Sequence, residues 1–129
     1  MSFELAREVL GYAKAELEKA LRTGDAFLYR SAADKAFLAL VVAVNAYVRA
    51  IGGAEPASRS ERRLPGKMGR ENLRALYSDL MRTLHEEAFY EGAYQPEEVE
   101  YAFKKVEGCV EELEREAKRK LGLVEGAQG

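Results

Sequence analysis

The chain has 129 residues, a formal net charge of −2, one cysteine and no tryptophan. This length suffices for one domain with its own core, and the near-neutral charge excludes a general electrostatic affinity for nucleic acid or an anionic membrane. The single Cys109 excludes an internal disulfide. The N-terminus MSFELAREVL lacks the basic start and apolar core of a signal peptide, so we expect a cytoplasmic protein. The excess of Glu and Arg over Asn and Gln is typical of hyperthermophile proteins.

The first half of the chain predicts two antiparallel helices joined by a short turn. Apolar residues recur at steps of three and four over residues 2–22, which places them on one helical face. Gly24 is expected to end this helix, and Asp25 can cap the next one, which continues to Ile51. This second helix contains the longest uncharged run of the chain, residues 36–48. Thirteen residues are too few to span a bilayer, so the run is interpreted as the buried centre of the fold, not a membrane segment.

The second half predicts a long loop and two further helices. Residues 52–69 contain two prolines and no helical periodicity, and a connection of this length is expected to be functional or mobile. A third helix is predicted over residues 70–91. A fourth begins at Pro96 and ends at Gly122, which leaves 123–129 as a frayed tail. The fold class is therefore all-α, an up-down-up-down four-helix bundle in one domain, 1–129.

The sequence excludes the common metal and nucleotide sites of helical proteins. A di-iron bundle needs Glu-x-x-His on two helices, but the only histidine is His85, and Arg82 stands three residues before it. One Cys and one His cannot form a zinc site, and the glycines do not form a P-loop. We therefore expect no metal and no cofactor. The simplest interpretation of His85 is a structural, hydrogen-bonded residue at the rim of the core. The alternatives are a binding or a catalytic role together with Arg82.

The loop is the other candidate binding region. It contains Arg59, Arg62, Arg63 and Lys67 against two acidic residues, and arginine side chains match phosphate oxygens. No aromatic residue lies among them for base stacking, so a solvated loop is the competing interpretation.

Two segments resemble the HEPN superfamily. Residues 24–53, with the Asp34-Lys35 pair, are similar to the second helix of HEPN proteins, and residues 84–113, LHEEAFYEGAYQPEEVEYAFKKVEGCVEEL, resemble the archaeal PaREP branch. Tyr90 belongs to the second match, and we take it and His85, with the four loop cations, as candidate ligand-binding residues. The resemblance implies a four-helix fold and often a dimer. Its catalytic members are metal-independent ribonucleases with an Arg-x(4–6)-His motif, and other members are nucleotide-binding modules or partners of nucleotidyltransferases.

The Arg-x(4–6)-His motif is not intact in this chain. The positions that it requires before His85 hold Ser78, Asp79 and Leu80, and Arg82 is separated from His85 by two residues only. We therefore predict a non-catalytic interaction module, or one that binds nucleotide or RNA. The alternative is an atypical ribonuclease that uses Arg82 and His85.

The apolar character of the second helix also predicts self-association. Three neighbouring helices would leave one apolar strip uncovered, and a second copy is the commonest way to bury such a strip. We expect a homodimer with part of this helix at or beside the interface, and the candidate residues are Phe37, Val41, Val44 and Val48.

Overall fold

The computed structural model describes residues 2–50, 71–92 and 95–128 of the chain. These residues are almost entirely helical and contain no strand, which confirms the predicted all-α bundle. The predicted 52–69 loop, with its four cations, lies outside the described residues.

The first two helices and their turn have the predicted form. Helix α1 spans Ser2–Thr23 and helix α2 spans Ala26–Ala50. Between them Gly24 has a φ of 72°, and its N–H donates to the carbonyl of Ala20 at 2.7 Å. The Asp25 carboxylate accepts from the backbone N–H groups of Phe27 at 2.9 Å and Leu28 at 3.2 Å. A left-handed glycine therefore ends one helix and an acidic cap starts the next.

The third helix differs from the prediction in its winding. Helix α4, Glu71–Leu80, continues without a break into η2, Met81–Glu91, which has the wider turns of a π-helix. Gly92 follows with a φ of 70°, and its N–H donates to the carbonyl of Glu87, five residues earlier. The sequence predicted an ordinary helix because Leu80, Leu84 and Ala88 recur at steps of four. That step lies between the turn of an α-helix and that of a π-helix, so it fits both.

The last helix begins where predicted and ends later. Helix α5 runs from Pro96 to Gln128, with Glu97 and Glu98 in its first turn. We expected Gly122 to end it, and this end point is wrong. A glycine inside a helix costs only about 1 kcal/mol relative to alanine, and Gly122 is preceded by a run of good helix formers, Ala117 to Leu121.

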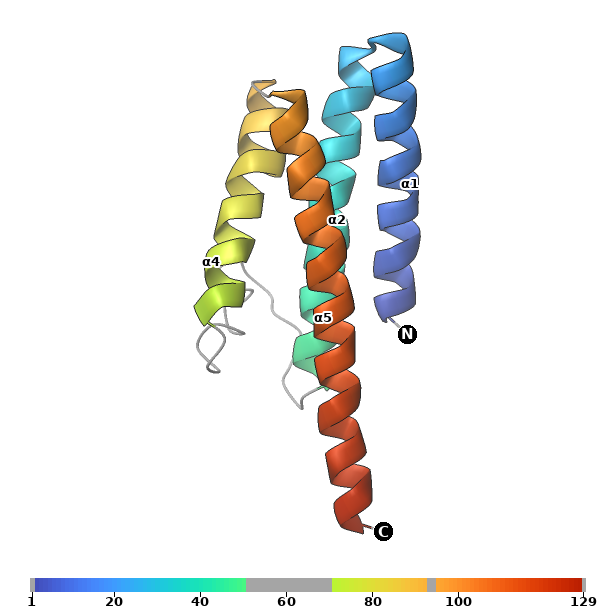
Figure 1. Ribbon diagram of the computed structural model, residues 1–129, viewed down its shortest axis with the longest axis vertical. Helices are drawn as coiled ribbons and strands as arrows, with labels where there is room; N and C mark the ends of the chain where they lie inside the picture. The colour runs from blue at the N-terminus through green and yellow to red at the C-terminus, as the bar shows by residue number, and fades with distance from the viewer. Residues whose placement is uncertain (1, 51–70, 93–94, 129) are drawn as a thin grey trace.

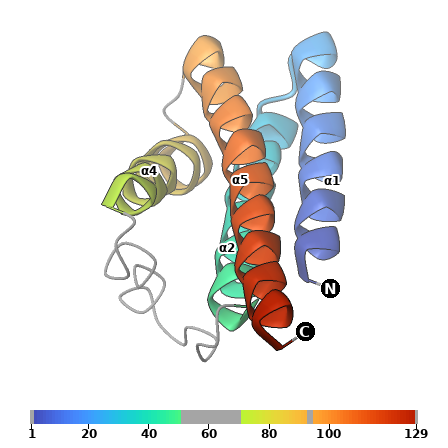
Figure 2. The ribbon, with the colours of Figure 1, turned by 60° about the horizontal axis from the view of Figure 1, so that its bottom comes forward.

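Helix α2 is the centre of the bundle. It contacts α1, η2 and α5, and its contact with α1 is the most extensive in the described part of the chain. Figure 1 shows α5 in front of α2, with α1 and α4 on either side and the chain running up, down, up and down. The view in Figure 2 shows α4 tilted relative to the other three helices.

Small residues allow α1 and α2 to pack closely. The buried stripe of α1 includes Ala6, Ala13 and Ala20, and that of α2 includes Ala32, Ala36, Ala39 and Ala43. By length and composition α2 could cross a membrane, but 56% of its most apolar window is buried inside the protein. Helix α2 therefore contributes buried side chains to its packing against all three neighbouring helices.

Candidate functional site

Helix η2 has a groove on each of its two sides. The first, here called the α2–η2 groove, has a volume of about 370 Å³ and is lined by Phe37, Tyr77, Met81, His85, Glu86, Tyr90 and Glu91. The second, the η2–α5 groove, has a volume of about 610 Å³ and is lined by Asp79, Leu80, Arg82, Thr83, Glu86, Glu87, Glu91, Glu98, Tyr101, Ala102 and Lys105. The wider turns of η2 lie between the two, and π-type turns are frequent at functional sites.

His85 is held by an aromatic row and a carboxylate in the α2–η2 groove. Its ring stacks on Phe37, with centroids 5.6 Å apart, and on Phe89, with centroids 5.8 Å apart. Phe37 also meets Tyr77 at 5.6 Å in a tilted arrangement. The Nδ1 atom of His85 lies 2.9 Å from Oδ1 of Asp34 on α2. The carboxylate fixes the orientation of the ring, and the other ring edge stays half exposed.

The Asp34-Lys35 pair does not act as a unit. Asp34 faces η2 and contacts His85, whereas Lys35 faces α1 and forms an ion pair with Glu16. Ser31 also donates to Glu16, at 2.9 Å. Burial alone would raise the pKa of Glu16, but the hydrogen bonds from Lys35 and Ser31 outweigh it, so this pKa is lowered. Asp34 and Lys35, although adjacent on α2, thus contact two different helices, η2 and α1.

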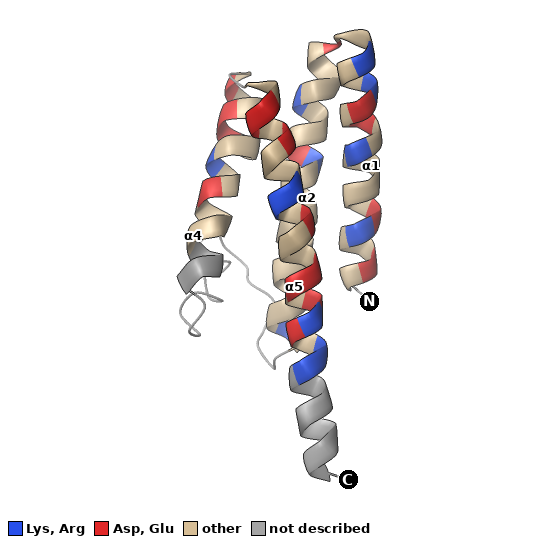
Figure 3. Cartoon of the chain, viewed as in Figure 1, with Lys and Arg blue, Asp and Glu red and all other residues tan. Residues whose placement is uncertain are grey.

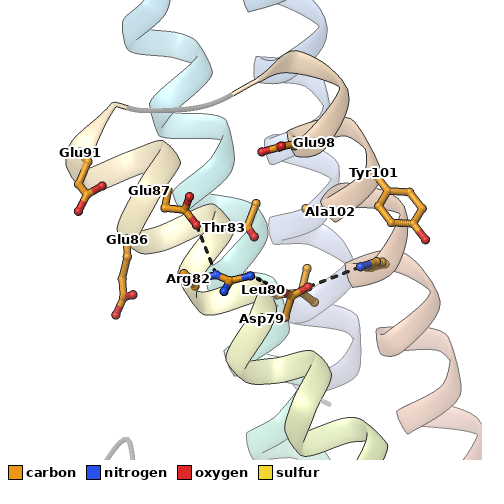
Figure 4. Close-up of a pocket in the computed structure, with 11 residues that line it drawn as sticks. Asp79, Leu80, Arg82, Thr83, Glu86, Glu87, Glu91, Glu98, Tyr101 and Ala102 are labelled. Carbon is orange, nitrogen blue, oxygen red and sulfur yellow. Dashed lines mark hydrogen bonds and ion pairs between the residues drawn. The ribbon is translucent and has the colours of Figure 1, made fainter.

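Arg82 lies in the η2–α5 groove and is neutralised there by carboxylates. Its Nη2 atom is 2.7 Å from Asp79 and its Nε atom is 3.4 Å from Glu87. Lys105 of α5 reaches the same Asp79 at 3.5 Å and lies over the ring of Tyr101 at 4.5 Å. Figure 4 shows Arg82 between Glu87 and Asp79. The guanidinium therefore has its charge satisfied within the protein.

The structure does not bring Arg82 and His85 together. Arg82 lines only the η2–α5 groove and His85 only the α2–η2 groove. Three residues correspond to more than half a turn of a π-helix, so the two side chains point to different sides. A ribonuclease mechanism needs the acid/base group and the cation at one substrate, and this arrangement does not supply that.

Tyr90 lies where a ligand could reach it. Its side chain is 76% exposed at the edge of the α2–η2 groove, which it lines together with His85. These are the two predicted ligand-binding residues within the described part of the chain, and they share one groove.

Arg30 is a structural residue of this region that the sequence analysis missed. Its Nε donates to the carbonyl of Phe89 at 2.8 Å and its Nη2 to that of Tyr90 at 3.0 Å. The last carbonyls of a helix lack partners within the helix, so a cation at this end satisfies them and the helix dipole. Arg30 thereby joins the start of α2 to the end of η2. Nothing in its sequence context distinguishes it from a surface arginine.

Acidic side chains gather where η2 meets the start of α5. The η2–α5 groove contains five carboxylates and two cations. Figure 3 shows this concentration of acidic positions at that end of the bundle. Within the described residues, no group of three or more His, Cys, Asp or Glu side chains could hold a metal ion. The excess of negative charge works against phosphate-bearing ligands at both grooves.

A separate apolar surface covers one side of the α1–α2 pair. On α1 it contains Leu5, half-buried Val9 and Tyr12, which recur at steps of four and three; Leu5 is 50% and Tyr12 70% exposed. On α2 it contains Leu38, 49% exposed, half-buried Val42 and Asn45, with the same steps. We call this set the α1–α2 face.

The two halves of the α1–α2 face are neighbours because of the helix register. Glu16 of α1 pairs with Lys35 of α2, and the helices are antiparallel. Tyr12 and Val9 lie one and two turns before Glu16 on α1. Leu38 and Val42 lie one and two turns after Lys35 on α2. Tyr12 is therefore level with Leu38, and Val9 with Val42.

The predicted interface residues divide into two groups. Val44 and Val48 are 1% and 0% exposed, so they belong to the core of the chain. Phe37 and Val41 are half-buried against the core, and Phe37 also lines the α2–η2 groove. The sequence could not separate these residues because α2 is apolar on nearly every side.

Comparison with protein-family models, with curated proteins and with solved structures gave no match.

Proposed function

We propose that this chain is a non-catalytic, HEPN-like interaction module that acts as a homodimer. The observation that carries the proposal is the α1–α2 face. Leu5, Tyr12 and Leu38 are each about half or more exposed, and they lie on one side of a helical pair. Monomeric proteins rarely leave a contiguous apolar surface of this kind to water.

A second copy of the chain is the occupant that fits this face best. Both helices present side chains at steps of three and four, the spacing by which antiparallel helices interlock in bundles. Two α1–α2 pairs brought face to face would form a four-helix layer across a two-fold axis. In a two-fold interface both copies use the same surface, so a single apolar strip on each chain is enough to form the contact.

Asn45 supports a two-fold partner. Its Oδ1 atom is buried and has no hydrogen-bond partner among the described residues. An asparagine amide both donates and accepts, so after a turn about its Cβ–Cγ bond it can pair with the same amide of a second copy. A single asparagine in an apolar helix seam fixes register and oligomeric state in this way.

The separation of Arg82 and His85 favours the non-catalytic assignment over the ribonuclease alternative. Arg82 is engaged by two carboxylates in one groove, and His85 is stacked in the other. The alternative is tested by incubating the protein with RNA in the presence of EDTA. Cleavage that disappears in His85→Ala would replace our assignment with the ribonuclease.

Sedimentation equilibrium at micromolar concentration tests the dimer. We expect twice the 14.4 kDa mass of one chain. Leu38→Glu should give the monomer, because the interface would bury two unpaired carboxylates. Asn45→Asp should weaken the dimer by placing like charges across the axis, while Asn45→Leu should keep the chains associated but no longer fix their register.

Leu21→Glu is the matched control for Leu38→Glu. Leu21 is 47% exposed and follows Arg7 and Lys14 at intervals of seven, so it shares the side of α1 that reaches α5. The Leu21→Glu substitution should therefore leave the dimer intact. A monomeric wild-type protein, or equal effects of Leu21→Glu and Leu38→Glu, would contradict the proposal. So would a monomer that binds phosphatidylcholine vesicles through Leu38.

A further inference from the structure

The α2–η2 groove combines aromatic rings with negative charge. Phe37, Tyr77, His85 and Tyr90 supply four of its seven lining side chains, and Glu86 and Glu91 supply two carboxylates. Among the described residues that line it, none is Lys or Arg. Its volume of about 370 Å³ is at the lower end for ligand pockets and suits a small head group.

The aromatic wall is fixed before any ligand arrives. Phe37, His85 and Phe89 form a continuous stack, and Asp34 holds the His85 ring at 2.9 Å. Asp34 also balances any positive charge on that ring. Tyr90, 76% exposed, is the side chain left to close over a ligand.

Glu86 and Glu91 line both grooves beside η2, so the α2–η2 groove shares their negative charge with the η2–α5 groove. In Figure 4, Glu86 and Glu91 point away from Arg82 and from α5. Glu91 is exposed at the last residue of η2. The nearby cation, Arg30, is bound to the carbonyls of Phe89 and Tyr90 and does not line the groove.

We propose that the α2–η2 groove binds an organic cation, a guanidinium or an alkylammonium group. Aromatic faces attract such cations, and a carboxylate completes their charge, whereas a phosphate would be repelled by Glu86 and Glu91. The other groove shows the same chemistry within the chain, since Lys105 lies 4.5 Å from the centre of the Tyr101 ring and 3.5 Å from Asp79. Tyr90 and Glu91 offer the corresponding pair to a ligand from outside.

The cation can come from a free small molecule or from an arginine or lysine side chain of another protein. Tetramethylammonium and methylguanidinium probe the first source, and the blocked peptide acetyl-Gly-Arg-Gly-amide probes the second. AMP tests the competing class, a stacked nucleotide. Binding is followed by NMR chemical shifts of the full chain at millimolar ligand.

We expect at least one cation to bind and AMP not to bind. Tyr90→Ala and Glu91→Gln should each weaken the bound cation about fivefold or more. Tyr101→Ala is the matched control, an exposed tyrosine whose ring already carries Lys105, and it should leave the affinity unchanged. All three positions are exposed, so the variants should fold, which circular dichroism checks.

The outcomes separate the two sources. Binding of the free head groups supports a small molecule, and binding of the peptide alone supports a partner side chain. Binding of AMP alone, binding of nothing, or equal affinity in Tyr90→Ala and the wild type would overturn the inference. The oligomeric state does not enter this test, because the groove and the α1–α2 face contain different residues.

Discussion

The α1–α2 pair, of 22 and 25 residues, and the α4–η2 helix, of 10 and 11, use their sequence in different ways. The α1–α2 pair is regular, turns at strong local signals, Gly24 and Asp25, and packs through alanines that bring the two backbones close. The α4–η2 helix changes its winding at Met81 and has a groove on either side. One region builds the core, and the other carries the candidate binding chemistry.

The difference shows what a wider helix turn provides. A π-helix rotates successive side chains less than an α-helix does, so neighbouring residues spread over a different set of directions. Here Arg82 and His85 face different grooves although only two residues separate them. The α1–α2 pair leaves its exposed apolar side chains in one strip, which suits contact with another protein surface. Helix η2 instead distributes its side chains between two grooves.

The largest effect should come from removing a core leucine in either region. Leu40 of α2 and Leu84 of η2 are both 0% exposed. Each leucine-to-alanine change should lower the free energy of unfolding by about 2–5 kcal/mol, through lost burial and the remaining cavity. Leu40→Ala should cost more, because the close contacts of α2 on three sides hinder collapse of the cavity. Urea denaturation at fixed protein concentration measures both.

The comparison of the two leucines tests how rigid η2 is. If Leu84→Ala costs as much as Leu40→Ala, η2 is as rigid as α2 and the two regions do not differ in this respect. Leu21→Ala is the control for a half-exposed leucine outside the α1–α2 face, and it should cost less than either.

The second prediction compares the two turn glycines. Gly24 and Gly92 both have a positive φ, near 70°, and they end helices α1 and η2. Alanine at either position should cost about 1–2 kcal/mol, because a Cβ atom disfavours the left-handed conformation. The two costs should be similar, because nothing lies within 4 Å of the added Cβ at Gly24, and at Gly92 the nearest atom, the Arg30 guanidinium carbon at 3.4 Å, is at an ordinary contact distance.

An Arg30→Ala background shows whether the Arg30 side chain constrains this turn. Gly92→Ala should lower the free energy of unfolding by the same amount with and without Arg30, which thermal denaturation can measure. A smaller cost in the Arg30→Ala background would mean that the guanidinium restricts the added methyl group.

The signals that predicted the fold are local and short in range. Gly24 ends a helix through its own backbone hydrogen bond, and Asp25 starts the next one through its side chain, so both could be predicted without the rest of the chain. Gly122 carries the same local signal, but no cap or turn follows it, and the helix continues. The winding of η2 could not be predicted, because steps of four fit both kinds of helix.

The candidate site depended on contacts between distant residues. His85 and Tyr90 were found as isolated residues, but the partners that define the groove, Asp34 and Phe37, are about fifty residues away. Arg30 is about sixty residues from the carbonyls it binds. No periodicity in a single sequence encodes such pairings, whereas the apolar strip of α2 could be expected because it follows from the helix itself.

The smallest predicted effect concerns the polar contacts that attach α1 to the other helices. Glu16 of α1 binds Lys35 and Ser31 of α2, and Glu114 of α5 binds Arg7 of α1. The hydrogen bond from Arg7 lowers the pKa of Glu114, and the hydrogen bonds from Lys35 and Ser31 lower that of Glu16 against its burial. The ion pairs of Arg82, in contrast, join it to carboxylates of the continuous α4–η2 helix, Asp79 and Glu87.

A carboxyl whose pKa is lower in the folded than in the unfolded protein stabilises the fold above its unfolded pKa, here 4.5, and this contribution is lost as the pH falls through the folded value. We therefore expect the free energy of unfolding to fall below about pH 4.5 and Glu16→Gln to reduce that fall. Glu18→Gln is the matched control, since Glu18 is exposed on the same helix and makes no ion pair among the described residues. Urea denaturation at pH 7 and pH 3.5 measures the effect. An equal fall in the wild type and in Glu16→Gln would show that the attachment of α1 to α2 rests on its alanine packing, with no measurable contribution from Glu16.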